Sequence, residues 1–340
     1  SLTPRVSYRY TYDDYRYFRH DLSRARSQHH GHALNTEING TWHTSAGDIG
    51  IGAEMRNETI RSSNIGNHRR TNYGFYAEFR TDRIDRLSVN AGAYINYHSD
   101  YGWQVFPGID VGYEFVPRWK IVAHTGMGQR IPSFTDLYLN QPPGNIGNPD
   151  LLTERSWQVE GGIKYLGDRL IAHTSVFYRN MNNFIDWVRS SAGEPWQPDN
   201  FQRNRVRGIT ASGRYRLSNS ESQVNWSAGL AYTWLSPRFT GSYDAGLLSR
   251  YAIESLRHQL IASLQVTSGR FIANTAIRLN ERISYRQYAI SDVRLGYRFR
   301  PIDLYLDVQN IFDVTYIEAA AVPMPGRWMT LGLKYTIGQR

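Results

Sequence analysis

The sequence contains no cysteine in its 340 residues, which excludes a disulfide framework, thiolate catalysis and thiolate metal sites. It also lacks any apolar run close to the roughly 18 residues that a membrane helix requires, and its mean hydropathy is negative. These absences exclude a helical membrane protein. They leave open a membrane β-barrel, because the strands of such a barrel turn half of their side chains towards a polar lumen.

No dense block of one charge occurs, although the formal net charge is +9. A positive charge of this size could indicate a nucleic-acid partner. The basic residues are scattered along the whole chain and match no nucleic-acid-binding motif, so we expect no nucleic-acid partner. No signal-peptide pattern precedes Ser1, and we therefore expect a processed or truncated chain.

Polar and apolar residues alternate through almost the whole chain. Aliphatic residues occupy the even positions of 302–309, and aliphatic residues with Tyr335 occupy the odd positions of 329–337. This period of two is typical of β-strands that have one polar face in contact with water and one apolar face. About sixteen such strands are predicted, most of them about twice the usual length of a soluble strand. That length suits a tilted membrane crossing of about 9–11 residues with extensions. The predicted strands are 4–13, 32–44, 48–61, 70–81, 86–98, 103–116, 118–129, 155–166, 169–186, 204–217, 222–235, 256–267, 270–282, 287–299, 302–312 and 327–338.

The connections between these strands alternate between short and long. Short ones lie at 44–48, 81–86, 117–118, 166–168, 218–221, 268–269 and 300–301, and longer ones at 14–31, 61–69, 131–154, 188–203, 236–255 and 313–326. Two of the intervening connections, near Asp100 and at 282–286, stay brief. Outer-membrane barrels have this pattern, with tight periplasmic turns and long extracellular loops. The sequence therefore predicts an all-β fold, a single transmembrane antiparallel β-barrel region over residues 1–340 with its long loops outside the cell.

Several stretches resemble a known family. Residues 129–138 (Gln-Arg-Ile-Pro-Ser-Phe-Thr-Asp-Leu-Tyr), 147–151 (Gly-Asn-Pro-Asp-Leu) and 154–156 (Glu-Arg-Ser) are similar to the arginine–proline and asparagine–proline boxes of TonB-dependent outer-membrane transporters. Residues 308–316 and 325–327 resemble the closing segment of that family. The resemblance implies localisation in the bacterial outer membrane and active uptake of a scarce, bulky nutrient, energised by an inner-membrane complex through the TonB protein. It implies neither an enzymatic step nor a cofactor.

Two features depart from the family pattern. The family's barrels have about 22 strands and a plugged lumen, whereas about sixteen strands and no plug sequence are recognisable here. The chain also ends in Gly-Gln-Arg after Ile337 rather than on an aromatic residue. We therefore expect this chain to be the C-terminal part of a longer or split receptor, with the N-terminal plug domain and first strands absent.

The substrate is predicted from a further resemblance. Residues 183–188 and 200–208 are similar to a strand pair in the cobalamin (vitamin B12) receptors of this family, while a ferric-siderophore receptor would look much the same. Haem receptors of the family carry a histidine between the two boxes, and none occurs from Arg130 to Asn148. By analogy with some cobalamin receptors, a surface lipoprotein is a further expected partner.

Two other classes of protein stay open at this point. A diffusive sixteen-stranded porin is favoured by the strand count, whereas the boxes and closing segment favour the transporter. A surface-protein scaffold or adhesin is not excluded by the aromatic loops.

Transport requires side chains that converge on a ligand rather than a catalytic group. Aromatic residues in the long connections could pack against a corrin ring, and arginines could hold amides or carboxylates. The alternative is that Trp187 lies in an aromatic girdle and that the arginines bind lipopolysaccharide phosphates or carboxylates of the loops. The predicted ligand-contacting residues are Tyr138, Asn140, Trp187, Trp196, Arg203, Arg205, Tyr243 and Arg250.

We predict no metal site. Four histidines, His20, His29, His30 and His32, share the first long connection, but no tight ligand triad accompanies them, and we expect a solvated loop. Asp13, Asp14 and Asp110 lack the spacing of a calcium loop. The two boxes are expected to shape a loop rather than to contact ligand, because proline ends strand pairing and Gly147 permits a tight turn.

Overall fold

The protein is described here from a computed structural model. The structure describes residues 1–18, 20–21, 24–219, 222–240, 248–250, 256–283, 287–299, 301–319 and 322–337.

Sixteen long strands make up most of the chain, and each overlaps one of the sixteen predicted strands. The long strands are β1 (Leu2–Arg16), β2 (Arg26–His43), β3 (Asp48–Ser62), β4 (Gly66–Ile84), β5 (Leu87–His98), β6 (Gly102–Val116), β7 (Trp119–Arg130), β10 (Glu154–Leu166), β11 (Leu170–Arg189), β12 (Gln197–Arg216), β13 (Val224–Thr240), β15 (Leu256–Ser268), β16 (Phe271–Arg282), β17 (Tyr288–Phe299), β18 (Ile302–Gln309) and β21 (Trp328–Tyr335). The short elements are α1 (Phe134–Tyr138), β8 (Asn140–Gln141), β9 (Asn145–Ile146), β14 (Leu248–Ser249), β19 (Ile317–Ala319) and β20 (Val322–Pro323). No helix among the described residues is long and apolar enough to cross a membrane.

Several strands extend further than their predicted bounds at the end with the long connections. Pairing of β3 with β4 continues to Ser62 opposite Gly66, so the connection predicted at 61–69 is only three residues long. Similarly, β11 and β12 pair up to Val188 opposite Gln197. These extensions carry many polar residues, which hides them from an analysis of apolar alternation. The predicted long connection between β3 and β4 is therefore wrong.

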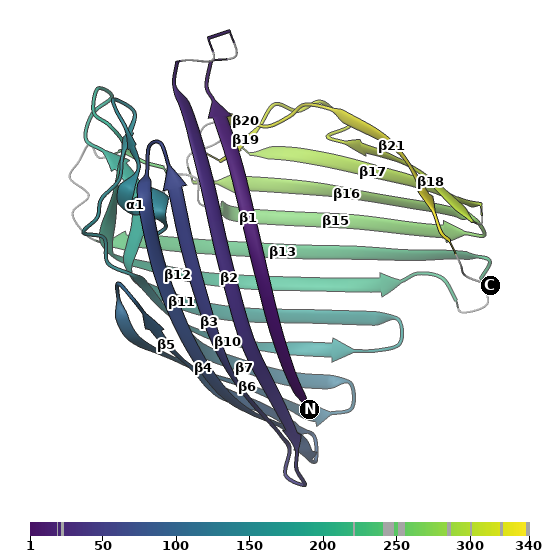
Figure 1. Ribbon diagram of the computed structural model, residues 1–340. Coiled ribbons are helices and arrows are strands. Elements are labelled where there is room, and N and C mark those ends of the chain that lie inside the picture. The colour runs from purple at the N-terminus through teal and green to yellow at the C-terminus, as the bar shows by residue number, and fades with distance from the viewer. Residues whose placement is uncertain are drawn as a thin grey trace.

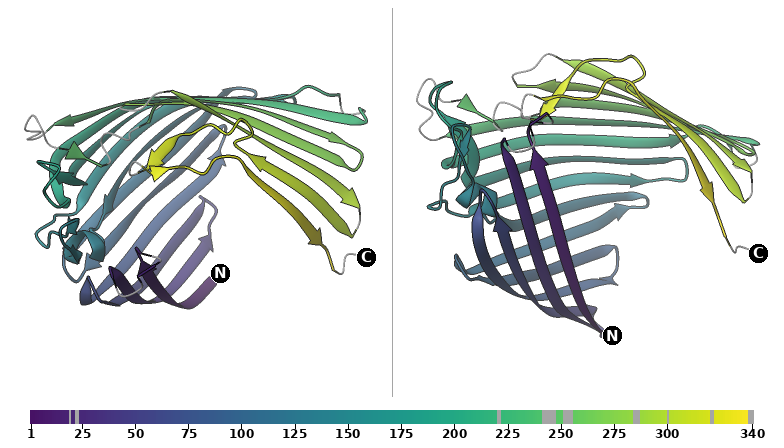
Figure 2. Two further views of the ribbon diagram at one scale, coloured as in Figure 1. Left: turned by 90° about the horizontal axis from the view of Figure 1, so that it is seen from above. Right: turned by 45° about the horizontal axis from the view of Figure 1, so that its top comes forward.

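Each long strand pairs antiparallel with its neighbours in chain order, which gives one continuous curved sheet (Figure 1). The sheet curls around a central space but stays open between its first and last strands (Figure 2). In the described part of the chain β1 pairs only with β2, and β21 pairs only with β18. These sixteen strands therefore do not close a cylinder by pairing β1 with β21.

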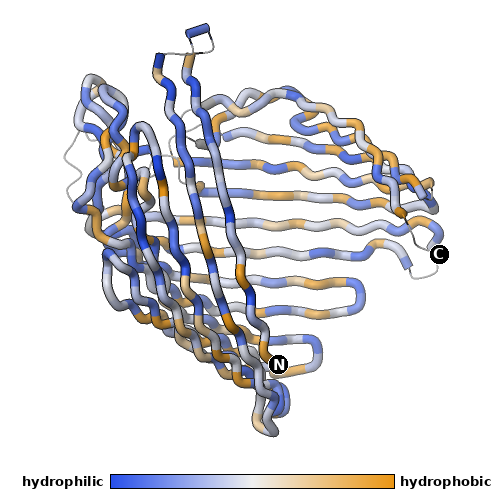
Figure 3. The backbone as a smooth tube through the Cα atoms, viewed as in Figure 1, coloured by the Kyte–Doolittle hydropathy of each residue, from blue (hydrophilic) through white to orange (hydrophobic). Residues whose placement is uncertain are grey.

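Hydrophobic and hydrophilic residues are interspersed along the strands (Figure 3), and their alternation gives the sheet an apolar face and a polar face. On β18 and β21, Leu304 lies opposite Leu333 and Leu306 opposite Leu331, which is 80% exposed. We call this face, with its exposed aliphatic side chains, the outward face. The alternate positions form the inward face and carry ion pairs such as Arg294–Asp307 (3.2 Å) and Arg298–Asp303 (3.6 Å). The predicted faces of these two strands are confirmed.

The described residues contain only a small buried apolar cluster, formed by Leu137, Leu151 and Ile185 with Tyr138 packed against it. This cluster lies under the connection between β7 and β10 rather than inside the sheet. Because the exposed aliphatic side chains all along the outward face have no protein cover, this face requires an apolar surrounding such as lipid.

Candidate functional site

The long connection from 131 to 153 begins with the short helix α1. Pro132 ends the pairing of β7, and the sequence Ser133-Phe-Thr-Asp136 forms a capping box. The Ser133 hydroxyl accepts a hydrogen bond from the backbone N–H of Asp136 (3.0 Å), and the Asp136 carboxylate accepts one from the backbone N–H of Ser133 (3.0 Å). This pair of bonds fixes the start of the helix at the mouth of the sheet.

The Asp136 carboxylate joins this helix to two strands. It is 4% exposed and accepts hydrogen bonds from the Arg130 guanidinium (3.0 Å) and from the indole N–H of Trp187 (3.1 Å). The same guanidinium donates to Glu154 (2.9 Å), which also accepts from the backbone N–H of Ile185 (2.7 Å). The ends of β7, β10 and β11 are thereby held together around one buried carboxylate.

The second box closes the same connection onto α1. The backbone N–H of Asn148 donates to the Asp136 carbonyl (2.8 Å), and the Asn148 amide donates to the Pro198 carbonyl (3.2 Å). A Cβ at Gly147 would lie 2.7 Å from the carbonyl carbon of Leu137, so only glycine fits there. These contacts support the prediction that both boxes shape the loop.

Trp196 contacts two arginines. The guanidinium carbons of Arg189 and Arg250 are each 4.5 Å from the Trp196 ring centroid, a cation–π distance. The Arg250 guanidinium donates to the Asn145 side-chain oxygen (2.9 Å), and its backbone N–H donates to the Trp187 carbonyl (3.0 Å). The result is a flat cationic and aromatic stack above the end of β11.

Tyr138 forms a second flat surface with a histidine from β4. The Tyr138 and His68 rings are stacked at 3.7 Å with an interplanar angle of 5°. Exposed Asn140 follows, and its backbone N–H donates to the Asn64 carbonyl (2.7 Å). We call Tyr138, His68, Arg189, Trp196 and Arg250 the mouth cluster.

The structure thus brings together part of the predicted contact set. Tyr138, Asn140, Trp196 and Arg250 lie at the mouth, whereas Trp187 is 5% exposed and supports Arg250 and Asp136 from below. Sequence reasoning missed His68, Asp136, Asn145 and Arg189. The capping-box pattern at Ser133–Asp136 could have identified Asp136.

Arg203 and Arg205 lie elsewhere. Both are exposed on the outward face of β12, opposite Asn182 and Asn180 of β11, while the inward face of this region carries Asn204 and Val206. Tyr243 lies outside the described residues. The predicted substrate contacts of these three residues stay predictions.

The histidines and aspartates considered for metals do not gather in one place. His29, His30 and His32 lie in β2 rather than in a loop, so that expectation is wrong; the strand begins six residues earlier than predicted because its pairing with β1 continues to Arg26. The His30 and His32 rings bond to Tyr10 (2.9 Å) and Tyr8 (2.6 Å). Within the residues that the structure describes, no three metal-ligating side chains form a group that could hold an ion.

The carboxylates of Asp14 and Asp110, which were considered for a calcium site, are also far from each other in the sheet. Asp14, in β1, forms ion pairs with Arg16 (2.6 Å) and Arg26 (2.8 Å). Asp110, in β6, instead accepts a hydrogen bond from His124 of β7 (2.6 Å). The Asp14 carboxylate is thus neutralised by arginines rather than free for a cation.

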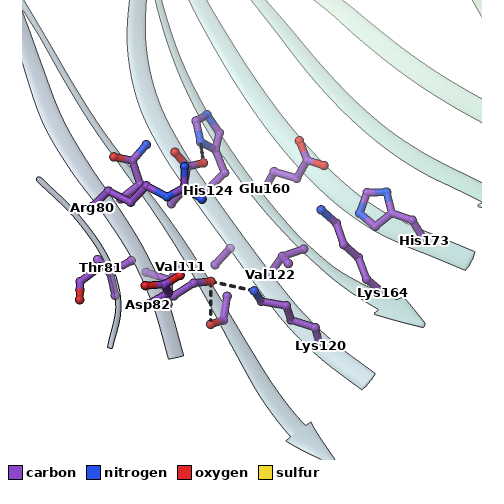
Figure 4. A pocket seen from close by; sticks show the side chains of 16 residues that line it. Arg80, Thr81, Asp82, Val111, Lys120, Val122, His124, Glu160, Lys164 and His173 are labelled. Atoms are coloured by element: carbon purple, nitrogen blue, oxygen red, sulfur yellow. Dashed lines mark hydrogen bonds and ion pairs between the residues drawn. The ribbon is translucent and has the colours of Figure 1, made fainter. Parts of the chain in front are cut away.

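A polar pocket of about 460 Å³ lies on the inward face near the short turns (Figure 4). Lys120 donates to Ser88 (2.8 Å), and Glu160, Lys164 and His173 approach from β10 and β11. The buried Nε2 atom of His173 has no hydrogen-bond partner in the described part of the chain. This pocket was not predicted from the sequence, although polar residues at alternate positions of β10 indicate a strand face in contact with water.

Tyr101 ties the turn between β5 and β6 to the connection that carries α1. Its hydroxyl donates to the Leu151 carbonyl (3.2 Å). Burial, followed by the nearby Asp100 carboxylate, raises the pKa of Tyr101 to about 12. The neutral phenol is therefore the form that the folded mouth favours.

Comparison with known proteins decides the family. The family model for the TonB dependent receptor-like β-barrel matches residues 2–311. The chain belongs to this family. It is accordingly an outer-membrane protein, as the exposed apolar face requires.

Two curated relatives are transporters of vitamin B12. The chain is 24% identical over 275 residues to the vitamin B12 transporter BtuB of Vibrio vulnificus, a match that covers 79% of this chain and 43% of the relative. It is 24% identical over 183 residues to BtuB of Photobacterium profundum, covering 53% of this chain and 25% of the relative. The chain thus spans less than half the length of the curated relatives that it matches.

Solved structures of transporters for several different substrates share the fold. The copper transporter OprC superposes with a TM-score of 0.77 at 16% identity, covering 98% of this chain and 62% of that one. The siderophore receptor PirA from Pseudomonas aeruginosa superposes with a TM-score of 0.66 at 19% identity, covering 91% of this chain and 55% of that one. The FrpB iron transporter from Neisseria meningitidis gives 0.70 at 14% identity, with coverages of 91% and 56%. At these identities the similarity shows the fold alone.

Proposed function

We propose that the chain forms the barrel part of a TonB-energised transporter that takes up a scarce, bulky nutrient, with cobalamin as the first candidate. Support for active uptake comes from the family match over residues 2–311. Support for cobalamin comes from the two curated relatives, both named as vitamin B12 transporters. A ferric siderophore is the second candidate, since siderophore and iron receptors are among the similar structures.

The mouth cluster is the observation that carries the ligand-binding proposal. Two groups of flat side chains, Tyr138 with His68 and Trp196 with Arg189 and Arg250, lie at the end of the sheet with the long connections. Flat rings provide contact area at low entropic cost, and guanidinium groups donate hydrogen bonds to amide carbonyls or carboxylates. Such a surface suits a large conjugated ligand with polar side groups.

The open edges of the sheet argue against a stand-alone porin and for a transporter that is coupled to TonB. A stand-alone sixteen-stranded porin requires β1 to pair with β21, and no such pairing exists among the described strands. The open edges favour a larger barrel completed by further strands, in which a plug occupies the lumen and contacts TonB. A surface lipoprotein above the mouth is a further proposed partner.

A binding titration tests the ligand assignment. The complete protein, with every segment that its gene encodes, is titrated with cyanocobalamin and separately with ferric enterobactin. Replacement of Trp196 by leucine removes the ring that both arginines contact and should weaken binding of the true ligand about tenfold, roughly the value of one desolvated cation–π contact. Trp103→Leu is the matched control, because Trp103 lies on the outward face of β6 and is 65% exposed.

Each outcome assigns the ligand or removes the proposal. Cobalamin binding that is weakened by Trp196→Leu and not by Trp103→Leu supports the first candidate. Binding of the siderophore alone, with the same dependence on Trp196, moves the assignment to the second. Equal binding by both variants removes the mouth cluster from the ligand site.

A further inference from the structure

An outward patch on β10–β13 carries five arginines and no acid. The antiparallel registers place these side chains in rows across neighbouring strands. The upper row contains Arg155, Asn182 and Arg203, and the next row contains Trp157, Asn180, Arg205 and Arg238. Arg207 follows in the third row, next to Tyr178 and Ser236. We call Arg155, Arg203, Arg205, Arg207 and Arg238 the arginine patch.

All five arginines of the patch are exposed, and none forms an ion pair with a described carboxylate. The outward positions of 155–165, 170–182, 203–215 and 226–240 contain neither aspartate nor glutamate. Arg205 lies directly opposite Arg238. Like charges at such a position, with Cβ atoms about 5 Å apart, destabilise a sheet. A surface with this arrangement is stabilised when an anion lies between the arginines.

The patch has a defined height on the sheet. It lies at the end where β10 begins and β11 ends, next to the long connections. Trp157 and Tyr178, with ring centroids 6.3 Å apart, lie within its two lower rows, and the exposed aliphatic residues Val176 and Ile209 form the next row down. Aromatic rows of this kind mark the boundary between hydrocarbon and headgroups. The arginine patch therefore lies at headgroup level of the outer leaflet.

Amide groups lie between the arginines. The Asn182 side-chain oxygen accepts a hydrogen bond from Arg203 (3.2 Å), and the buried Oδ1 atom of Asn180 has no partner among the described residues. Arginine binds phosphate with a planar fork of donors. Three rows at about 6.6 Å spacing extend over roughly 13 Å, which is wide enough for a headgroup with more than one phosphate.

We propose that the arginine patch binds the phosphorylated sugar headgroup of an outer-leaflet glycolipid. The site is on the opposite face of the sheet from the mouth cluster. The inference rests on the membrane location and not on the transported ligand, so it can succeed or fail independently of the proposed function.

The probe is bis-phosphorylated lipid A in phosphatidylcholine nanodiscs that contain the complete, delipidated protein. Binding is followed by native mass spectrometry and by thermal melting. The variant Arg205→Gln with Arg238→Gln should bind lipid A at least tenfold more weakly. The matched control is Arg179→Gln with Arg214→Gln, which removes the same charge from the inward face of β11 and β12 and should bind within twofold of the unaltered protein.

A reversal of stability gives a readout that a merely structural role would not produce. In neutral detergent without lipid A, the Arg205/Arg238 variant should melt at or above the temperature of the unaltered protein, because like-charge repulsion is removed. With lipid A present, the order should reverse. Enzymatically dephosphorylated lipid A should not produce the reversal.

Three results would overturn the proposal. The first is lipid A binding by the Arg205/Arg238 variant within twofold of the unaltered protein. The second is equal binding of dephosphorylated lipid A. The third is equally tight binding of phosphatidylglycerol, which would reduce the patch to a general anionic surface.

Discussion

Removal of the Asp136 carboxylate should open the mouth of the barrel without unfolding its wall. In the folded protein this carboxylate, 4% exposed, accepts four hydrogen bonds, from Arg130, the Trp187 indole, and the backbone and hydroxyl of Ser133. Asp136→Ala leaves the buried Trp187 indole N–H and the partly buried Ser133 backbone N–H without a partner. Only part of the arginine's pairing survives, through Glu154.

The size of this effect follows from the pairing. A buried donor left without a partner costs about 1–3 kcal/mol, and such losses are not additive. Because the Arg130 side chain is 44% exposed and keeps its ion pair with Glu154, we expect a total of about 2–4 kcal/mol. The equilibrium for opening residues 131–153 should therefore shift by about one and a half to three powers of ten. The long strands do not depend on this carboxylate, so the loss is local.

Hydrogen exchange measured by mass spectrometry checks this value. In Asp136→Ala, amides of Leu137, Gly147 and Asn148, which are bonded within the closed connection, should exchange faster by that factor. The barrel's heat-modifiable migration on gels should be unchanged. The control is Asp150→Ala in the same connection, because Asp150 is exposed. Equal exchange rates in the two variants would refute the role assigned to Asp136.

Further predictions concern the wall and the turns. Leu333→Arg, on the outward face, should destabilise the barrel by about 2–4 kcal/mol near the bilayer midplane, whereas inward Lys334→Gln should be nearly silent; equal effects in a urea-unfolding assay would mean that the faces are misassigned. Gly147→Ala should prevent closure of the loop, since its Cβ would meet the backbone of α1 at 2.7 Å; fast exchange of the α1 amides would show this, and unchanged exchange would contradict it. The pKa of Tyr101 is raised to about 12, so its stabilising bond to Leu151 should be complete below about pH 10 and lost as the pH rises towards 12. A difference titration of absorbance near 295 nm against Tyr101→Phe should show one phenol ionising near pH 12, and ionisation near pH 10 would disprove it.

The strands and their faces could be predicted because lipid imposes a period of two on every crossing. Leu331 is apolar for that reason alone, and alternation recovers it without knowledge of its neighbours. The upper ends of β11 and β12 could not be predicted in this way, since above the hydrocarbon both faces meet water and no alternation is required. Their extension brings Trp187 under Arg250, a contact between residues 63 positions apart that no local pattern encodes.

The residues of the candidate site likewise divide into those that could be predicted from the sequence and those that could not. Arg203 and Arg205 alternate along β12 with the inward-facing residues Asn204 and Val206. Whether the arginines or their neighbours face the lumen depends on the register, since a shift of one position reverses every side chain. The loop residues Tyr138 and Trp196 could be selected as aromatic groups in long connections. Their partners His68 and Arg189 could not, because each stack joins segments that are distant in sequence or that face each other only after the loops close.

The unpaired outer margins of β1 and β21 have a consequence for biogenesis. Within hydrocarbon each backbone amide or carbonyl left without a partner costs several kcal/mol, and the 15-residue β1 presents a whole row of them. Insertion into the bilayer must therefore end with hydrogen bonding along the free edges of β1 and β21, whichever strands provide it.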